Sequence, residues 1–383
     1  MNEFIKKLNA DFKIEIHESS TYDHIGSFYI EDERGLVTDL HLCDVNLKSL
    51  DTLIPIASSL THLSLENCKV SSIEQLGVFE NLIELEIDNN PISNFKDLEL
   101  LNNLKKLVLV CLDIDSTIHL PVITSLTDLS LASNFGFTRI EGLENLPHLE
   151  YLDLSGNDDI ILDNIPTNYS VKTLKLDTCK LDRIQGLEKF RNLEFLSLYC
   201  NSIQKIEGLD SLTSLKKLSL HNNEIRKIEG LEKLELLEEL DLSYTEVEKI
   251  EGLEKLHQLK ELGLAVTNVR TIEGLDHLKN LKVLMLDGNG LSQVNELPLQ
   301  NLKILYLSKN QICDIPSNWI KMEEIHLNGN CINDVDPKWM SNIVNKCYID
   351  LTHNPIKKIE GKIPDHITVD FNSRYGGVPT VLL

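Results

Sequence analysis

Tyrosine and histidine side chains recur in this sequence at steps that would bring them side by side. Tyr199 and His221 are 22 residues apart, and Tyr244 follows 23 residues after His221. A tyrosine joins a large apolar ring to one hydroxyl, so tyrosines on an exposed surface are typical anchors for another protein. The chemistry predicted for this group is therefore non-covalent binding.

The sequence carries no signature of catalysis or of a bound cofactor. It has no G-x-x-x-x-G-K-[ST] phosphate loop, no H-E-x-x-H zinc motif and no G-x-S-x-G nucleophile elbow. Its 12 histidines are spread without the spacing of a metal site. We therefore expect a protein that is not an enzyme and that has no catalytic residues, no metal and no cofactor.

Leucines recur at a constant step through the middle of the chain. Counted from the first leucine of each unit, apolar residues hold positions 1, 4, 6, 11, 14, 17 and 20. Positions 4 and 6 have strand spacing, whereas the later ones are three apart, as in a tight helical turn. Each unit is predicted to form one coil with one short strand and one turn. The leucines that start units at intervals of 22 residues are Leu193, Leu215, Leu237, Leu259 and Leu281.

The ninth position of the units holds small side chains that can form hydrogen bonds where the chain leaves its strand. An asparagine there can satisfy several backbone groups at the bend, because its amide both donates and accepts. The residues at this position include Asn201, Asn223, Asn289, Asn310, Asn330, Asn354, Cys179, Thr245 and Thr267.

The pattern L-x-x-L-x-L-x-x-[N/C/T]-x-[I/V/L] resembles the leucine-rich repeat. Units with Ile-Glu-Gly-Leu, as at residues 228–231 and 250–253, resemble its 22-residue class, which includes a regulatory subunit of protein phosphatase 1 and the bacterial internalins. The resemblance implies an α/β repeat solenoid: a leucine-rich repeat horseshoe with a parallel β-sheet on its concave face and short 3-10 or turn segments on its convex face. For the phosphatase regulator, it also implies an acidic and aromatic concave face that holds the partner enzyme.

Positions 2, 3, 5, 7 and 8 of each coil should point away from the core into the concave face. Positions 5 and 7 hold eight acids, including Asp350, against the single base Lys175. Two simpler interpretations stay open: charged runs are often only solvated, and sheets favour aromatic residues in any case. The predicted partner-binding residues are Glu66, Glu86, Asp88, Asp153, Asp177, Tyr199, His221, Asp241, Tyr244, Met285, Asp287, Tyr306 and His326.

Charge and composition narrow the class of partner. The formal net charge is −23, which disfavours nucleic acid and anionic membranes and favours a basic protein. There is no run of signal-peptide type and no apolar span long enough to cross a bilayer. The eight cysteines show no C-x-x-C pair and are interpreted as reduced thiols. We therefore expect a cytoplasmic protein that is monomeric alone, with a nuclear site or non-classical export left open.

The predicted organisation is one elongated domain. Residues 1–35 would form an N-terminal cap of a short helix and a hairpin strand, residues 36–362 about 15 repeats, and residues 363–383 a C-terminal cap.

The leading hypothesis is a non-catalytic protein–protein interaction scaffold that binds a folded, basic partner on its concave face. Regulation of a cytosolic enzyme such as a phosphatase is one role that fits. Two alternatives stay open: a bacterial effector or internalin-like recognition module, and a fragment of a larger repeat-bearing enzyme.

Overall fold

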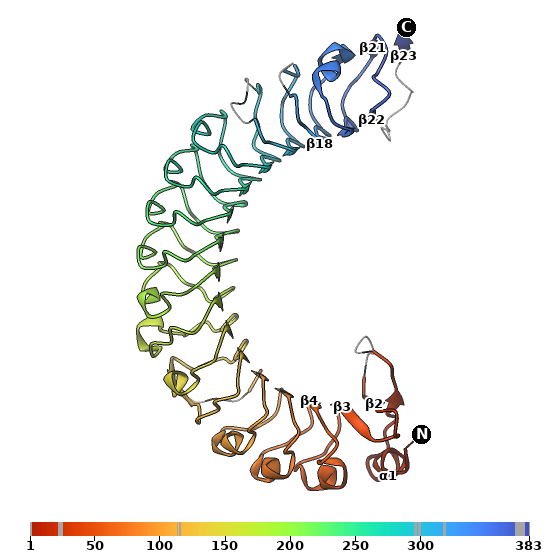
Figure 1. Cartoon of the computed structure of the whole chain (residues 1–383), viewed down its shortest axis with the longest axis vertical. Helices are drawn as coiled ribbons and strands as arrows, with labels where there is room; N and C mark the ends of the chain where they lie inside the picture. The colour runs from red at the N-terminus through yellow and green to blue at the C-terminus, as the bar shows by residue number, and fades with distance from the viewer. Residues whose placement is uncertain are drawn as a thin grey trace. The chain divides into compact units, whose positions relative to one another are not determined.

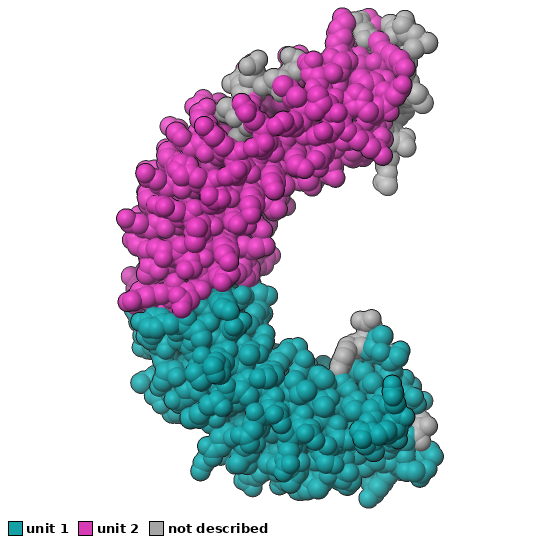
Figure 2. Space-filling view, viewed as in Figure 1, with its two compact units in different colours: residues 1–180 teal, residues 181–383 magenta. Residues whose placement is uncertain are grey.

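The computed structural model describes residues 2–21, 26–112, 114, 116–294, 297, 300–316, 319–371 and 380–382. The chain divides into two compact units, unit 1 (Met1–Lys180) and unit 2 (Leu181–Leu383), which Figure 2 colours separately. Both units are built from stacked coils of one kind.

Unit 1 begins with its helix and a hairpin. In α1 (Glu3–Phe12), the Asn2 side chain caps the first turn by accepting a hydrogen bond from the Phe4 N–H, and Ile5 and Leu8 are buried. Strand β1 (His17–Glu18) pairs in parallel with β2 (Phe28–Glu31), which pairs antiparallel with β3 (Val37–Cys43). A parallel ladder then continues through β4 (His62–Glu66), β5 (Glu84–Asp88), β6 (Lys106–Val110), β8 (Asp128–Ser130), β10 (Tyr151–Asp153) and β11 (Thr173–Lys175).

Unit 2 carries a second parallel ladder. Its strands are β12 (Phe195–Ser197), β13 (Lys217–Ser219), β14 (Glu239–Asp241), β15 (Glu261–Gly263), β16 (Val283–Met285), β17 (Ile304–Tyr306), β18 (Glu324–His326), β20 (Cys347–Asp350) and β22 (Ile367–Asp370). Within each unit, Figure 1 shows these strands on the hollow side of the stack and the turns on the outer side.

The outer side is made of short 3-10 turns and two small sheets. The turns are η1 (Asp51–Ile56), η2 (Glu74–Val78), η3 (Lys96–Leu100), η4 (Leu143–Asn145) and η5 (Leu162–Asn164) in unit 1, and η6 (Leu187–Lys189) and η7 (Pro337–Asn342) in unit 2. The sheets join β7 (Thr117–His119) to β9 (Arg139–Glu141) in unit 1, and β19 (Asp334–Val335), β21 (Lys358–Glu360) and β23 (Thr380–Leu382) in unit 2. The repeat pattern predicted turns rather than strands at these places. In unit 1 the β-branched Ile118 and Ile140 are buried opposite each other, which favours a strand.

The core of each coil is the repeated apolar set. In the coil that begins at Leu237, Leu240 and Leu242 are buried beneath the strand, and Val247, Ile250, Leu253 and Leu256 are buried beneath the turn. Gly252 allows neighbouring turns to approach closely: its φ is +69°, and an added Cβ would lie 2.4 Å from the Ile228 carbonyl oxygen.

The asparagines of position 9 form a buried ladder. Asn223 Nδ2 donates to the carbonyl oxygens of Leu198 and Leu220, both at 2.9 Å, and its Oδ1 accepts from the Ile203 N–H at 3.0 Å. Each amide therefore ties its own coil to the preceding one. Asn90, Asn310, Asn330 and Asn354 bond in the same way.

A second asparagine ladder lies where the chain enters its strand. Here the asparagine directly precedes the first residue of a coil, and its Nδ2 donates to a carbonyl of the preceding coil. Examples are Asn81 to Ser58, Asn103 to Glu80, Asn280 to His257, Asn301 to Lys279 and Asn345 to Lys321. The sequence analysis missed this ladder, although the recurrent Asn-Leu pair before a strand is a visible signal.

The predicted fold class is confirmed: the chain is a parallel-sheet solenoid of the leucine-rich repeat type, with turns on its outer side. The predicted boundaries of the caps and the repeat array stay predictions. Within the predicted C-terminal cap, residues 372–379 and 383 lie outside the described residues.

Candidate functional site

The strands present one set of alternating side chains to solvent, which we call the inner face of each unit. In β14, Leu240 is buried, whereas Glu239 and Asp241 on either side are half-buried. The register pairs Leu218 with Leu240 and Leu240 with Leu262 across neighbouring strands. Because the register has no slip, positions 3 and 5 of successive coils lie side by side on the inner face.

The first aromatic group of unit 2 is a stepped stack of three rings. The ring centroids of Tyr199 and His221 are 5.2 Å apart, and those of His221 and Tyr244 are 4.9 Å apart. His221 Nδ1 lies 3.3 Å from Asp241 Oδ2, so the carboxylate orients the middle ring. The exposed fraction is 42% for Tyr199 and 53% for Tyr244. We call Tyr199, His221 and Tyr244 the first stack.

Tyr244 and Val266 share the left-handed backbone that recurs at position 8 of most coils, as at Cys200 and Asn222. Tyr244 has φ of 56° and Val266 has φ of 53°, a left-handed conformation that is rare for a β-branched residue. Both occupy position 8 of their coils, where the chain turns out of its strand, and Val266 is 42% exposed. The left-handed turn thus places two apolar side chains at the solvent boundary beside the first stack.

A second stack repeats this arrangement farther along unit 2. The rings of Tyr306 and His326 stack with centroids 4.6 Å apart and an interplanar angle of 14°, and Tyr348 lies 5.9 Å beyond His326. Glu324 Oε2 is 3.4 Å from His326 Nε2. Burial raises the pKa of Tyr306, and the carboxylates of Glu324, Asp287 and Glu261 add to the rise. The tyrosine hydroxyl therefore stays protonated on this acidic surface.

The remaining predicted residues of unit 2 lie near these stacks. Met285 pairs in register with Tyr306, and its side chain is half-buried. Asp287 has a local structural role, because its Oδ1 accepts a 2.7 Å hydrogen bond from the Ser308 N–H.

The predicted acids of unit 1 form two groups. Glu66 and Asp88 are register neighbours on β4 and β5, and Glu86 Oε2 accepts a hydrogen bond from Ser64 Oγ at 3.1 Å. Burial raises the pKa of the Asp88 carboxyl, the Cys111 thiol opposes the shift, and the Glu66 carboxylate adds to it. Burial, and to a smaller extent the like charge on the neighbouring strand, thus disfavour ionisation of Asp88.

We expect Asp88→Asn to stabilise unit 1 slightly at neutral pH. The carboxyl pKa is higher in the folded chain than in the unfolded chain, so the ionised form destabilises the fold above the normal carboxyl range. The melting midpoint at pH 7 should rise by on the order of 1 °C, and the gain should vanish as the pH falls below that range. Glu99→Gln, on the exposed part of η3, is the matched control and should change little at either pH. Equal gains from both variants would contradict a local cost of ionisation at Asp88.

Asp153 and Asp177 surround a lysine. Lys175 is the last residue of β11 and pairs in register with Asp153 of β10. Its Nζ is 5.6 Å from the centroid of the Tyr151 ring, and Tyr151 pairs with Thr173 of β11. Burial alone would lower the pKa of Lys175, but Tyr151, Asp153 and Asp177 together raise it. This part of unit 1 holds a cation between an aromatic ring and two carboxylates.

Sequence reasoning missed position 3 of the strands. These residues stand on the same face as position 5, as strand alternation requires, and they add six acids: Asp39, Glu84, Asp128, Glu239, Glu261 and Glu324. Two of these charges are compensated nearby, because Lys106 Nζ lies 3.2 Å from Glu84 and Lys217 Nζ lies 2.7 Å from Glu239. The inner face is acidic but contains neutralised pairs.

Two histidines of unit 1, His41 and His62, were also missed. They line a hollow of about 500 Å³ on the inner face, together with Phe28 and Val108. His62 Nδ1 is 2.9 Å from Asp39 Oδ1, and His41 Nδ1 is 2.8 Å from Ser64 Oγ. Position 3 for His62 and position 5 for His41 would have identified both.

Parts of the chain match two known families of repeats. The family described as "Leucine Rich repeats (2 copies)" matches residues 124–167 and 191–233, and "Leucine rich repeat" matches residues 300–356. These matches fall on the coils described above. The chain is a leucine-rich repeat protein. No curated protein matches its sequence.

Solved structures share the fold of this leucine-rich repeat protein at low sequence identity. An internalin of Listeria monocytogenes aligns with a TM-score of 0.57 and 19% identity over 89% of this chain and 92% of that one. A leucine-rich repeat protein of Leptospira interrogans aligns at 0.58 and 24%, over 82% and 89%. Toll of Drosophila, in complex with Spatzle, aligns at 0.55 and 18%, over 85% of this chain and 54% of that one.

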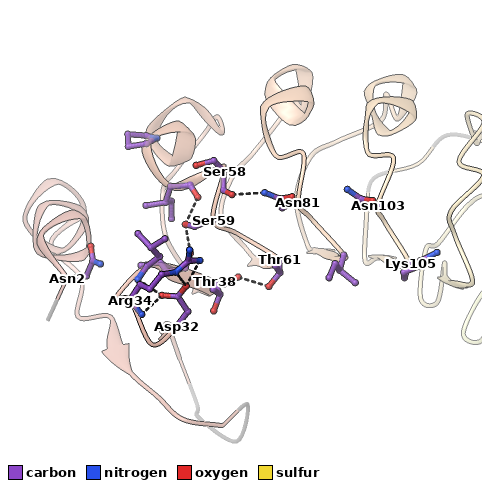
Figure 3. A pocket seen from close by; sticks show the side chains of 15 residues that line it. Asn2, Asp32, Arg34, Thr38, Ser58, Ser59, Thr61, Asn81, Asn103 and Lys105 are labelled. Atoms are coloured by element: carbon purple, nitrogen blue, oxygen red, sulfur yellow. Dashed lines mark hydrogen bonds and ion pairs between the residues drawn. The ribbon is translucent and has the colours of Figure 1, made fainter.

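Another hollow lies at the start of unit 1 rather than on the strand face. It has a volume of about 710 Å³ and is lined by Asn2, Arg34 and Lys105 among others (Figure 3). Several of its polar side chains bond to the chain itself: Ser59 Oγ donates to the Val37 carbonyl at 2.6 Å, and Arg34 pairs with Asp32 at 2.9 Å. The first of these contacts lies within the first coil, and the second lies within the segment that precedes it.

Neither a metal site nor a membrane span is found in the part of the chain that the structure describes. Among those residues, no three histidine, cysteine, aspartate or glutamate side chains are grouped so as to hold a metal ion. No helix there is both long enough and apolar enough to span a bilayer.

Proposed function

We propose that this leucine-rich repeat protein is a non-catalytic scaffold that binds a folded, basic protein on its inner face. The first stack carries the proposal, because it places two exposed tyrosines and a histidine beside one another on consecutive coils. Aromatic side chains that are rigid, exposed and adjacent are typical of interface anchors.

Charge supports a basic partner. The acids at positions 3, 5 and 7 flank the first and second stacks, and the whole chain carries a net charge of −23. Complementary charge chiefly speeds the encounter of the two proteins and excludes acidic partners. Most of the affinity comes from aromatic rings that the partner covers on binding.

The test is a double substitution in the first stack. Tyr199→Ala with Tyr244→Ala should weaken partner binding by more than about 1 kcal/mol, because both rings lose contact area with the partner. The melting midpoint should stay close to that of the wild type, since both side chains are exposed. Affinity capture from the native cell, quantified by mass spectrometry, measures the loss.

A tyrosine away from the inner face provides the control. Tyr169 is 46% exposed and lies between η5 and β11 rather than on a strand. Tyr169→Ala should therefore retain the captured protein. Equal capture by the double variant and the wild type would remove the first stack as an anchor.

The regulation of a phosphatase is the more specific form of this proposal. It rests on the sequence resemblance and on the acidic, aromatic inner face. If it holds, a phosphatase catalytic subunit should be enriched in the capture, and its activity should change when the purified repeat protein is added.

An internalin-like recognition module is the second candidate. The structural similarity to an internalin of Listeria monocytogenes favours it, at an identity that supports the fold alone. Detection of the protein in culture supernatant or in host cells would support this candidate over the regulator. The third possibility, a part of a larger repeat-bearing enzyme, would require a catalytic domain elsewhere in a longer chain.

A further inference from the structure

A small hollow lies on the inner face of unit 2 where a strand position lacks a side chain. Gly263, in β15, pairs in register with Asp241 on one side and Met285 on the other. The hollow over it has a volume of about 200 Å³ and is also bordered by Phe195 and Glu261. This exceeds the roughly 150 Å³ of an apolar cavity that accepts benzene, so a side chain of moderate size can enter.

The charged lining of the hollow is mostly anionic: Glu239, Asp241 and Glu261 border it, together with the cation Lys217. Asp241 Oδ1 accepts a 2.9 Å hydrogen bond from the Ser243 N–H, which fixes the carboxylate beside Gly263. An added Cβ at Gly263 would lie 2.4 Å from that same oxygen, so the carboxylate occupies space that only glycine leaves free. Glu261 adds a second carboxylate, whereas Glu239 at the border is already paired with Lys217.

Unit 1 contains the same arrangement with a lysine in the corresponding place. Asp153 pairs in register with Lys175, just as Asp241 pairs with Gly263. Asp153 Oδ1 accepts from the Ser155 N–H at 3.0 Å, matching the bond from Ser243 to Asp241. The two aspartates therefore accept the same backbone hydrogen bond, and in unit 1 the aspartate also raises the pKa of Lys175 on the neighbouring strand.

The ring and the second carboxylate are placed differently in the two units. Tyr151 lies two residues before Asp153 on β10, whereas Phe195 is on β12, two strands from Asp241. The feature that the two places share is an aspartate that accepts the same backbone hydrogen bond and faces the neighbouring strand, and a carboxylate so placed favours lysine or arginine over a neutral side chain.

We propose that the hollow over Gly263 receives a lysine or arginine side chain of the bound partner, which takes the place that Lys175 has beside Asp153. The aliphatic stem would lie against Met285 of the neighbouring strand, and the cationic group would reach Asp241 and Glu261. The inference rests on the proposed function, because it assigns a specific anchor to the partner that the inner face binds.

Methionine-methyl NMR with pentalysine tests the hollow without the natural partner. The chain has four methionines, and Met285 borders the hollow, whereas Met322 and Met340 are buried in the core. Saturable movement of the Met285 signal, with the Met322 and Met340 signals unchanged, is the expected result. Pentaglutamine should cause no shift, and parallel titrations with pentalysine and pentaarginine rank the two cations.

Two variants of the hollow and one matched control decide the outcome. Gly263→Lys supplies a cation from the chain itself and also displaces the Asp241 carboxylate, because its Cβ would lie 2.4 Å from Oδ1. Asp241→Asn removes the charge while its amide oxygen can still accept from Ser243. Each should weaken pentalysine binding by roughly tenfold. Val108→Lys makes the same charge change on the inner face of unit 1 and should have less than about a twofold effect. An unmoved Met285 signal, or equal weakening by Gly263→Lys and Val108→Lys, would overturn the proposal.

Partner capture separates this inference from the proposed function. Loss of capture in the Tyr199/Tyr244 double variant together with unchanged capture by Gly263→Lys would support the inner face and reject the hollow. Unchanged capture by the double variant would count against the proposed function, whatever pentalysine does.

Discussion

Replacing Leu240 with alanine should lower the free energy of unfolding of unit 2 by about 2–5 kcal/mol. The side chain is 1% exposed and lies beneath β14, in register with Leu218 and Leu262 of the neighbouring coils. Its truncation removes apolar contacts on both sides and leaves a cavity that a stacked coil cannot close without moving its strand. Because each coil supports the next, the loss should destabilise the whole of unit 2. Chemical denaturation followed by circular dichroism measures the change.

Leu236→Ala is the matched control for this prediction. Leu236 is 50% exposed and lies four residues before Leu240, so the same chemical change removes little buried area. Its effect should stay within about 0.5 kcal/mol. A Leu240→Ala variant as stable as Leu236→Ala would contradict the assignment of position 4 to the core.

Replacing Asn223 with alanine should lower the free energy of unfolding of unit 2 by about 1–3 kcal/mol or more. The amide serves three buried backbone groups: the carbonyls of Leu198 and Leu220 and the N–H of Ile203. Alanine leaves all three without the partner that they have in the folded coil. Thermal unfolding reports the loss, and faster amide exchange at Ile203 would locate it.

The chain itself provides a graded test of the asparagine ladder. At the same position, Thr245 Oγ1 donates only to the carbonyl of Leu242 in its own coil. Asn223→Thr should therefore keep one bond and fall between the wild type and Asn223→Ala in stability. An alanine variant that is no less stable than the threonine variant would show that the ladder contributes little.

The sequence specified the ladder of strands because its period is a direct physical constraint. Leucines at equal steps can all be buried only if each coil repeats the last, and the observed register pairs Leu196 with Leu218, Leu218 with Leu240 and Leu240 with Leu262. The same constraint placed Tyr199, His221 and Tyr244 beside one another. Their contacts follow from spacing alone.

Features set by single positions were harder to predict. The acids at position 3 and His62 were overlooked, because only positions 5 and 7 were compared between coils. His41 stands at position 5 and was overlooked within that comparison. The outer strands β7 and β9 depend on the packing of Ile118 against Ile140, which the repeat pattern does not encode. The hollow at Gly263 depends on one residue without a side chain. Its proposed role in binding a cation was inferred only by comparison with the register pair of Asp153 and Lys175.

Binding on the inner face is tested most directly by footprinting the captured complex. Tyrosine-directed oxidation of the wild-type protein, alone and with its purified partner, compares exposure residue by residue. The account predicts strong protection of Tyr199 and Tyr244 and no change at Tyr169, which is equally accessible away from the strands. Protection of Tyr169 with full reactivity at Tyr199 and Tyr244 would place the partner elsewhere and contradict the proposed function.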